Sequence, residues 1–307
     1  MTIAPYPVKS TVFVTCFFLI FVLFPIAALS QSDDEVITVE SAAVLLNATI
    51  LDSQGKAAVG LRREHFSVFE NGTKQEITYF SAAETPFAAV ILFDTSGSME
   101  SRMSMARSAA INFLDGLREN DNAAVYHFAA KVDLIQDFSG SRDLNEIVFD
   151  LKAHGMTALN DSIYKAAVEL SKRPEKRRAI IVLSDGADTF SKKSSEKALK
   201  AALDAEATIY TVDMSSMDTS VKERAQNQGA LKNFAEKSGG KFIATAGGAA
   251  LRHTLKGIVD ELGIQYTIGY ESTNAQKDGK YRAIEVKVAK PNLTIRTRKG
   301  YTASKRG

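Results

Sequence analysis

Hydrophobic and polar residues alternate with a strand-like period between residues 36 and 80. The segments with this pattern are residues 36–39, 44–51, 66–70 and 75–80. Polar turn sequences separate them, at residues 52–55 and at Asn71-Gly72. Asn-Gly between two alternating runs is a hairpin signal, so the pattern predicts a small antiparallel β unit.

The period changes from residue 87 to about residue 263. Residues 88–93 form a continuous apolar run, which is typical of a parallel strand buried on both faces. Apolar residues then recur at helical spacing from Met103 to Leu117. Further strands are predicted at 123–128, 132–138, 179–183, 208–212 and 241–244, with helices at 158–170 and 196–205. Alternating strands and helices predict a doubly wound, mostly parallel α/β sheet of the Rossmann-like kind.

From residue 264 onward the β pattern returns, with strands predicted at 265–270, 281–288 and 293–298. The β segments before and after the α/β block are each short for an independent core. We therefore expect residues 31–85 and 264–307 to combine into one antiparallel β module, with the α/β domain, residues 86–263, inserted between them.

The first thirty residues differ in composition from the rest of the chain. Lys9 is the only charge before an uncharged, apolar run over residues 10–32, and Ala28 and Ser30 precede Gln31 at the positions that small residues occupy before a cleavage site. This pattern predicts a secretory signal peptide, residues 1–30. An uncleaved membrane anchor is the alternative, because residues 11–29 are long enough to span a bilayer. Either way the charges flanking the run place the bulk of the protein outside, secreted, periplasmic or anchored facing outward.

Composition excludes several classes of function. The only cysteine, Cys16, lies in the leader, so a mature chain has no disulfide, thiolate metal site or cysteine nucleophile. A net charge of +2 gives no reason to expect a nucleic-acid partner. We interpret the basic run before the strand at 179–183 as a solvated connection; it comprises Lys172, Arg173, Lys176, Arg177 and Arg178.

Oxygen-bearing side chains follow the first strand of the α/β block. Asp94, Ser96 and Ser98 alternate at the carboxyl end of that strand, where such sheets bind ligands. Carboxylate and hydroxyl oxygens suit Mg²⁺, Ca²⁺ or Mn²⁺. Taken alone, the motif fits equally well a loop that caps the next helix.

Two later segments favour the metal site. Thr157 lies just before a predicted helix, and Asp185 follows the buried strand at 179–183. Three loops then bring oxygens to one edge of the sheet, and two carboxylates roughly neutralise a divalent cation. We predict one site formed by Asp94, Ser96, Ser98, Thr157 and Asp185. Mg²⁺ is the expected ion, with Mn²⁺ and Ca²⁺ as alternatives.

The combination of Asp94-x-Ser96-x-Ser98, Thr157 and Ser184-Asp185-Gly186 resembles the metal ion-dependent adhesion site of von Willebrand factor A-type (VWA) domains. The resemblance implies that the hydroxyls of Ser96, Ser98 and Thr157 bind the ion and that the two aspartates bind it directly or through water. It also implies a free coordination position for a partner's Glu or Asp carboxylate. Flanking segments, at 61–80, 266–270, 279–282 and 298–301, resemble bacterial VWFA-related domain proteins of the acidobacterial type.

These observations predict an exported, metal-dependent protein-binding module with an adhesion-like role. The alternatives are an envelope structural or assembly protein whose metal stabilises loops, and a metal-assisted hydrolase. No Gly-x-Ser-x-Gly elbow, lysine-bearing phosphate loop or His-Glu-x-x-His motif is present, so we expect no enzyme. We interpret His127 as a partly buried strand residue and His154 as a loop residue without a role. Asp188 and Asp161 are expected to orient the site's loops or to accept backbone hydrogen bonds.

Overall fold

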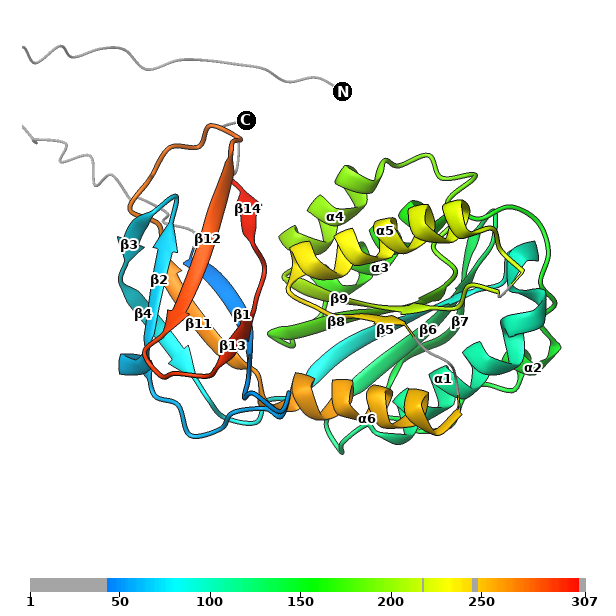
Figure 1. Cartoon of the computed structure of the whole chain (residues 1–307), viewed down its shortest axis with the longest axis horizontal. Helices are drawn as coiled ribbons and strands as arrows, with labels where there is room; N and C mark the ends of the chain where they lie inside the picture. The colour runs from blue at the N-terminus through cyan, green and yellow to red at the C-terminus, as the bar shows by residue number, and fades with distance from the viewer. Residues whose placement is uncertain (1–42, 217, 245–247, 304–307) are drawn as a thin grey trace, which may run out of the picture. The chain divides into compact units, whose positions relative to one another are not determined.

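The computed structural model describes residues 43–216, 218–244 and 248–303 (Figure 1). The leader, residues 1–30, and the strand predicted at 36–39 lie outside the described residues. Among the described residues, no helix is long and apolar enough to cross a membrane.

A six-stranded sheet forms the centre of the α/β part. Its strands, in spatial order, are β10 (Phe242–Ala244), β9 (Ala207–Asp213), β8 (Arg177–Ser184), β5 (Phe87–Asp94), β6 (Asn122–Phe128) and β7 (Val132–Ser139). Neighbouring strands are parallel except β7, which runs antiparallel to β6. The predicted doubly wound, mostly parallel sheet is confirmed.

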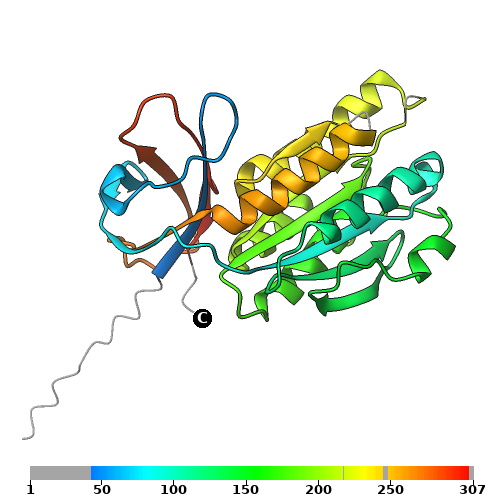
Figure 2. The same ribbon diagram turned by 90° about the horizontal axis from the view of Figure 1, so that it is seen from below.

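Helices cover both faces of this sheet (Figures 1 and 2). One face is covered by α1 (Met103–Asp115) and α6 (Gly248–Ile264), and the other by α3 (Leu159–Ser171), α4 (Ser195–Asp204) and α5 (Val221–Ser238). Two short helices, η2 (Gly97–Arg102) and α2 (Ile147–Asp150), precede α1 and α3. All eight residues of β5 are buried, because alternate side chains enter the two cores: Ile91 packs on the α1 side and Val90 on the α3 side. This is why the run lacks polar alternation.

Two four-stranded antiparallel sheets form the β module. The first, in spatial order, contains β13 (Thr294–Arg296), β1 (Ala43–Leu51), β11 (Tyr266–Glu271) and β4 (Ile77–Ser81). The second contains β14 (Gly300–Thr302), β12 (Tyr281–Val288), β2 (Phe66–Glu70, preceded by η1, Arg63–His65) and β3 (Thr73–Gln75). β1 pairs with β11, and β2 pairs with β12, so both sheets join strands from before and after the α/β part. Strands of both sheets contribute to a single apolar core, which includes Leu46, Val68, Ile268 and Ile284. The predicted module built from both chain segments is confirmed.

The strand predicted at 75–80 is divided between the two sheets. Gln75 ends β3 in one sheet, and Ile77 begins β4 in the other, with the exposed Glu76 between them. Both flanking side chains are buried, at 3% and 6% exposure, so the chain turns a corner around a shared core. A continuous alternating run cannot reveal such a change of sheet.

Arg177 is not part of a solvated connection, which corrects the interpretation of the basic run. It begins β8 and is fully buried. Its guanidinium donates to the carbonyl oxygens of Gly263 (2.6 Å), Ala83 (2.9 Å), Leu262 (3.3 Å) and Gln265. These carbonyls lie where the chain leaves the β module for β5 and where it returns from α6 to β11. The buried guanidinium therefore supplies hydrogen-bond donors to the backbone carbonyls at both connections between the β module and the α/β part.

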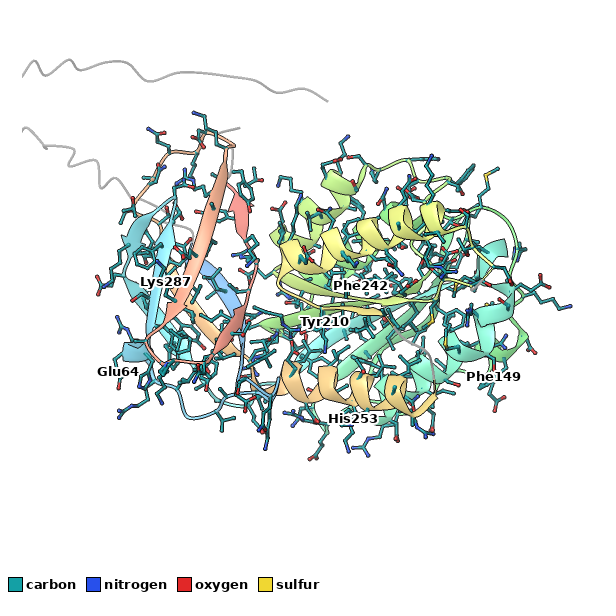
Figure 3. All side chains as sticks on the ribbon, viewed as in Figure 1. Glu64, Phe149, Tyr210, Phe242, His253 and Lys287 are labelled. Carbon is teal, nitrogen blue, oxygen red and sulfur yellow. The ribbon has the colours of Figure 1, made fainter. Side chains whose placement is uncertain are left out.

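Glu261 of α6 forms a second link at this junction. Its carboxylate accepts hydrogen bonds from the Tyr210 hydroxyl of β9 (2.7 Å) and from the Thr49 hydroxyl of β1 (2.9 Å), and it pairs with Arg296 of β13. Tyr210 lies in the sheet, between the helices that cover its two faces (Figure 3). The junction occupies the amino-terminal end of β8, which leaves the carboxyl ends of the strands to carry the candidate site.

Candidate metal site

Asp94 is the last residue of β5 and is fully buried. One carboxylate oxygen, Oδ1, accepts a hydrogen bond from the backbone N–H of Ser96 at 2.8 Å. The other, Oδ2, accepts one from the hydroxyl of Ser184 at 2.6 Å. The next turn of the chain and the end of the neighbouring strand β8 together fix the orientation of this carboxylate.

The environment of Asp94 disfavours its negative charge. Burial raises the pKa of Asp94 to about 6, the hydrogen bonds from Ser184 and Ser96 oppose that rise, and repulsion from Asp185 adds to it. Within the described part of the chain, no lysine or arginine forms an ion pair with Asp94. A buried, oriented carboxylate without a cationic neighbour fits a site for a metal cation.

Ser96 directly precedes η2, and Ser98 lies in the first turn of that short helix. Their hydroxyl oxygens are 3.2 Å apart, so the two side chains point to a common position. Between them, the N–H of Gly97 donates to the carbonyl oxygen of Gly155 at 3.2 Å. This contact brings the loop of Thr157 against the serine turn.

Thr157 is held by its backbone and not by its side chain. Its N–H donates to the Thr189 hydroxyl at 3.0 Å, and its carbonyl accepts from the N–H groups of Thr189 and Phe190 at 2.9 Å each. The residue is 3% exposed. Its own hydroxyl has no hydrogen-bond partner in the part of the chain that the structure describes. The hydroxyl is therefore the one polar group of Thr157 that remains for a ligand.

Asp185 follows β8 and is 6% exposed. Its Oδ1 accepts from the N–H of Ala187 at 3.0 Å, and its carbonyl accepts from the Ser215 hydroxyl at 3.4 Å. Gly186, next in the chain, has a φ of 86°, and a Cβ there would lie 2.6 Å from the carbonyl oxygen of Asn227. Glycine is needed at this position for both reasons.

Comparison with known proteins assigns part of the chain to a family. Residues 89–187 match the von Willebrand factor type A domain family, and this range contains all five predicted ligands. The chain contains a VWA domain. No curated protein gave a significant match to the sequence. The relationship to the acidobacterial-type subfamily stays a prediction.

Several solved structures are similar to part of this chain. The PilB minor pilin from Streptococcus sanguinis is 16% identical with a TM-score of 0.46, over 59% of this chain and 63% of the pilin. The vWF domain of the type V pili tip protein Mfa5 from Porphyromonas gingivalis is 14% identical with a TM-score of 0.49, over 60% of this chain and 98% of that domain. A von Willebrand factor type A protein from Catenulispora acidiphila is 16% identical with a TM-score of 0.47, over 86% of this chain and 64% of that one. The chain thus spans less than two thirds of the length of the pilin.

Two acidic residues near the VWA site orient its loops. Asp188 accepts from the N–H of Leu159 at 3.1 Å and from the Asn160 amide, at the start of α3. Asp161 accepts from the N–H groups of Lys192 (3.0 Å) and Lys193 (2.8 Å), and within the described part of the chain it forms no hydrogen bond with Thr157. Both residues therefore fix the loop after β8 against the start of α3.

Sequence reasoning missed the contribution of Ser184. Its position beside Asp185 was part of the motif, but only the structure shows that its hydroxyl bonds Asp94 across two strands and accepts from the N–H of Gly186 at 3.0 Å. The signal that could have revealed it is a serine at the end of a buried strand, one residue before a predicted ligand.

His127 and His154 lie near the site, and neither forms a hydrogen bond with its five residues. The Nδ1 of His127 is 3.2 Å from the Thr95 hydroxyl, and burial lowers the pKa of His127. The Nδ1 of the exposed His154 is 2.9 Å from the carbonyl oxygen of Lys152. The described residues hold no group of three or more His, Cys, Asp or Glu side chains placed for a metal, so a cation here depends on hydroxyl ligands as well as on the two carboxylates.

Proposed function

We propose that the VWA domain binds one divalent cation, Mg²⁺, with Mn²⁺ or Ca²⁺ as alternatives, through Asp94, Ser96, Ser98, Thr157 and Asp185. The bound ion then takes a Glu or Asp carboxylate of a protein partner as a further ligand. The observation that carries the proposal is the state of Asp94: it is fully buried and oriented by two hydrogen bonds, and it has no cationic side chain as a partner in the described chain.

The donor set suits a binding role. The carboxylates of Asp94 and Asp185 balance the charge of a divalent ion, while the hydroxyls of Ser96, Ser98 and Thr157 add none. The ion, when bound, supplies positive charge that attracts an incoming carboxylate. Among the described residues, neither His127 nor His154 is bonded to a ligand residue, which favours binding over hydrolysis.

An adhesion or assembly role outside the cytoplasm follows from combining this site with the predicted leader. The VWA domain match supports the domain assignment, and the leader supports export. The pilus proteins among the solved structures are similar in fold at low identity, so the proposal rests on the site and not on them.

Binding of a carboxylate to the metal ion can be tested with acetate, which carries a carboxylate and no other part of a partner protein. Mn²⁺-loaded protein enhances the relaxation of water protons when water is bound to the ion, and a carboxylate that replaces this water lowers the enhancement. We expect acetate to lower it and neutral acetamide to leave it unchanged. Equal behaviour of the two solutes would contradict carboxylate binding and would favour the alternative in which the ion only stabilises the loops.

The matched variants are Thr157→Val and Thr254→Val. The first removes the hydroxyl that has no partner, and we expect the protein to lose most of its bound Mn²⁺. The second removes an exposed hydroxyl of α6 that bonds its own helix at Ala250, and it serves as the control.

A further inference from the structure

The side chains of Thr49 and Gln265 meet where the β module joins the α/β part. Thr49 belongs to β1, and Gln265 lies between the end of α6 and the start of β11. Nε2 of Gln265 is 3.2 Å from the Thr49 hydroxyl oxygen, although the two residues are 216 positions apart in the chain. Each residue is only 2% exposed. A hydroxyl and a carboxamide are therefore held together at a site that is largely closed to bulk water.

Glu261 of α6 accepts the proton of this hydroxyl. The Thr49 hydroxyl donates to Oε1 of Glu261 at 2.9 Å. The Glu261 side chain is 11% exposed, and it pairs with Arg296, which balances its charge. A hydroxyl becomes a nucleophile when a base within hydrogen-bond distance can remove its proton. Thr49 and Glu261 have this arrangement.

Tyr210 of β9 connects the carboxylate to the amide. Its hydroxyl donates to Oε1 of Glu261 at 2.7 Å and lies 3.5 Å from Nε2 of Gln265. Burial, together with the nearby charge of Glu261, raises the pKa of the Tyr210 hydroxyl, so this group stays protonated. Tyr210 can therefore pass a proton from the carboxylate to the amide nitrogen.

The carbon atom of the amide, Cδ of Gln265, is the electrophile of this group. It is bonded to Nε2, which already contacts the Thr49 oxygen. The last torsion of a glutamine side chain is soft, so a small rotation turns Cδ toward the hydroxyl. Groups held with their reacting atoms about 3–3.5 Å apart react far faster than the same groups free in solution.

We propose that Thr49 and Gln265 form an intramolecular ester bond. The Thr49 oxygen attacks Cδ of Gln265, and Glu261 takes the hydroxyl proton. The bond between Cδ and Nε2 then breaks, the nitrogen takes up that proton through Tyr210, and one ammonia leaves. The reaction needs no oxidant, reductant or second substrate. Ammonia is protonated and diluted in the solvent, which favours the ester, and burial of the site protects the ester from hydrolysis.

The ester closes a covalent ring around the α/β part. Thr49 precedes this part in the chain and Gln265 follows it, so the ring contains the whole candidate metal site. A cross-link between residues that are far apart in the sequence restricts the unfolded chain and thereby stabilises the folded one. Cys16 is the only cysteine, so the chain has no disulfide within itself. The ester supplies a covalent cross-link by other chemistry, and it does not depend on metal binding.

Gln75 and Thr273 form a similar pair without a base. Nε2 of Gln75 donates to the Thr273 hydroxyl at 3.1 Å. Thr273 is exposed, and within the described part of the chain its hydroxyl donates to no carboxylate. We expect this pair to stay unlinked, so it serves as an internal control for the pair of Thr49 and Gln265.

Peptide mapping of the whole protein by mass spectrometry tests the proposal. Trypsin places Thr49 in a peptide that ends at Lys56 and places Gln265 in the peptide of residues 257–277. We expect these two peptides to be joined, with a mass equal to their sum less one ammonia, and to separate in hydroxylamine, which cleaves esters. The peptide of residues 75–102, which contains Gln75, should be free. Finding the Thr49 and Gln265 peptides separate, each at its full mass, would overturn the proposal.

Variants of the same protein identify the reacting groups. Thr49→Val and Glu261→Gln should give separate peptides, whereas Thr49→Ser keeps a hydroxyl and should give the joined pair. Asp260→Asn removes an exposed carboxylate next to Glu261 and is the matched control, so its peptides should be joined. Circular dichroism verifies that each variant is folded, and the map of the unmodified protein decides the proposal where a variant is not. A joined pair in Thr49→Val or in Glu261→Gln would overturn the assigned nucleophile or base.

Discussion

The hydroxyl of Ser184 donates a hydrogen bond to Oδ2 of Asp94 at 2.6 Å, across the boundary between β8 and β5. This bond joins two neighbouring parallel strands of the sheet. Asp94 ends β5, and Asp185 directly follows β8. The same hydroxyl accepts from the N–H of Gly186. One serine therefore supports both carboxylates of the site, Asp94 directly and Asp185 through the turn that follows it.

Replacing Ser184 by alanine should destabilise the metal-free protein at pH 7.5. The ionised Asp94 would lose a hydrogen bond in a buried setting, at a cost of about 1.5–3 kcal/mol in the free energy of unfolding. Urea unfolding measures this change. Ser162→Ala is the matched control, because Ser162 is equally buried but bonds the carbonyl of Leu159, so its loss should cost about 1 kcal/mol. Equal losses in the free energy of unfolding in the two variants would show that the hydrogen bond from Ser184 does not stabilise the ionised Asp94 more than an ordinary buried hydrogen bond would.

The stability of the metal-free protein should depend on the titration of Asp94. Its pKa is raised from 3.8 to about 6 in the folded protein, so the folded state binds the proton more tightly than the unfolded state. The contribution of protonated Asp94 to the free energy of unfolding is fully present below about pH 4 and is lost as the pH rises through 6. The loss amounts to up to about 3 kcal/mol. Urea unfolding in chelator from pH 4 to pH 8 should show the loss, and the difference between the unmodified protein and Asp94→Asn isolates it. A difference that does not vary with pH would contradict the account of Asp94.

Added Mg²⁺ should reverse this destabilisation above pH 6. An ion that binds only the folded state raises the free energy of unfolding by about 2.7 kcal/mol at a concentration a hundredfold above its Kd. Thermal unfolding at pH 7.5 should therefore shift upward with Mg²⁺ and return with chelator, with a smaller shift at pH 5, where protons compete for Asp94. Mn²⁺ and Ca²⁺ in parallel titrations rank the ions. An equal shift at both pH values would argue that the ion binds elsewhere.

Replacement of the buried arginine at the junction should destabilise the protein without altering the candidate metal site. Arg177→Met leaves four carbonyl groups without their donor, and we expect a loss of about 3 kcal/mol or more. Ser184 is at the other end of the same strand, roughly 23 Å away at 3.3 Å per residue, so Mg²⁺ affinity in the folded fraction should not change. Lys172→Met, at an exposed ion pair with Glu169, is the control and should cost less than about 1 kcal/mol. A small loss in Arg177→Met would mean that water satisfies the carbonyls.

The sequence predicted those parts of the fold that depend on local periodicity. β5 shows as a continuous apolar run because every residue in it is buried, and α1 shows as apolar residues at helical spacing because one face of it is buried. Both patterns can be recognised within a short stretch of sequence. The three-residue strand β14 was not predicted, because it is too short to show a period. The corner between Gln75 and Ile77 was not predicted either, because the alternation continues through it while the pairing partners change.

The candidate site was predictable as a set of residues and not as a set of contacts. Oxygen-bearing side chains just after buried strands could be identified from the sequence, since parallel strands end at one edge. The Ser184 bond to Asp94 and the Gly97 contact with Gly155 depend on which strands and loops are neighbours. The interpretation of Arg177 was wrong for a similar reason. A basic residue in a basic run is expected to be exposed, and its carbonyl partners come from two connections that are distant from it in the sequence.

The most direct test of the central claim is titration calorimetry of Mg²⁺ with the unmodified protein, Thr157→Val and Thr254→Val at pH 7.5. The Thr157 hydroxyl has no partner in the described chain, so its loss should leave the fold intact, as circular dichroism can verify. The account predicts one Mg²⁺ per chain in the unmodified protein and in Thr254→Val, and at least about tenfold weaker binding in Thr157→Val. Equal Mg²⁺ binding by all three proteins would contradict it.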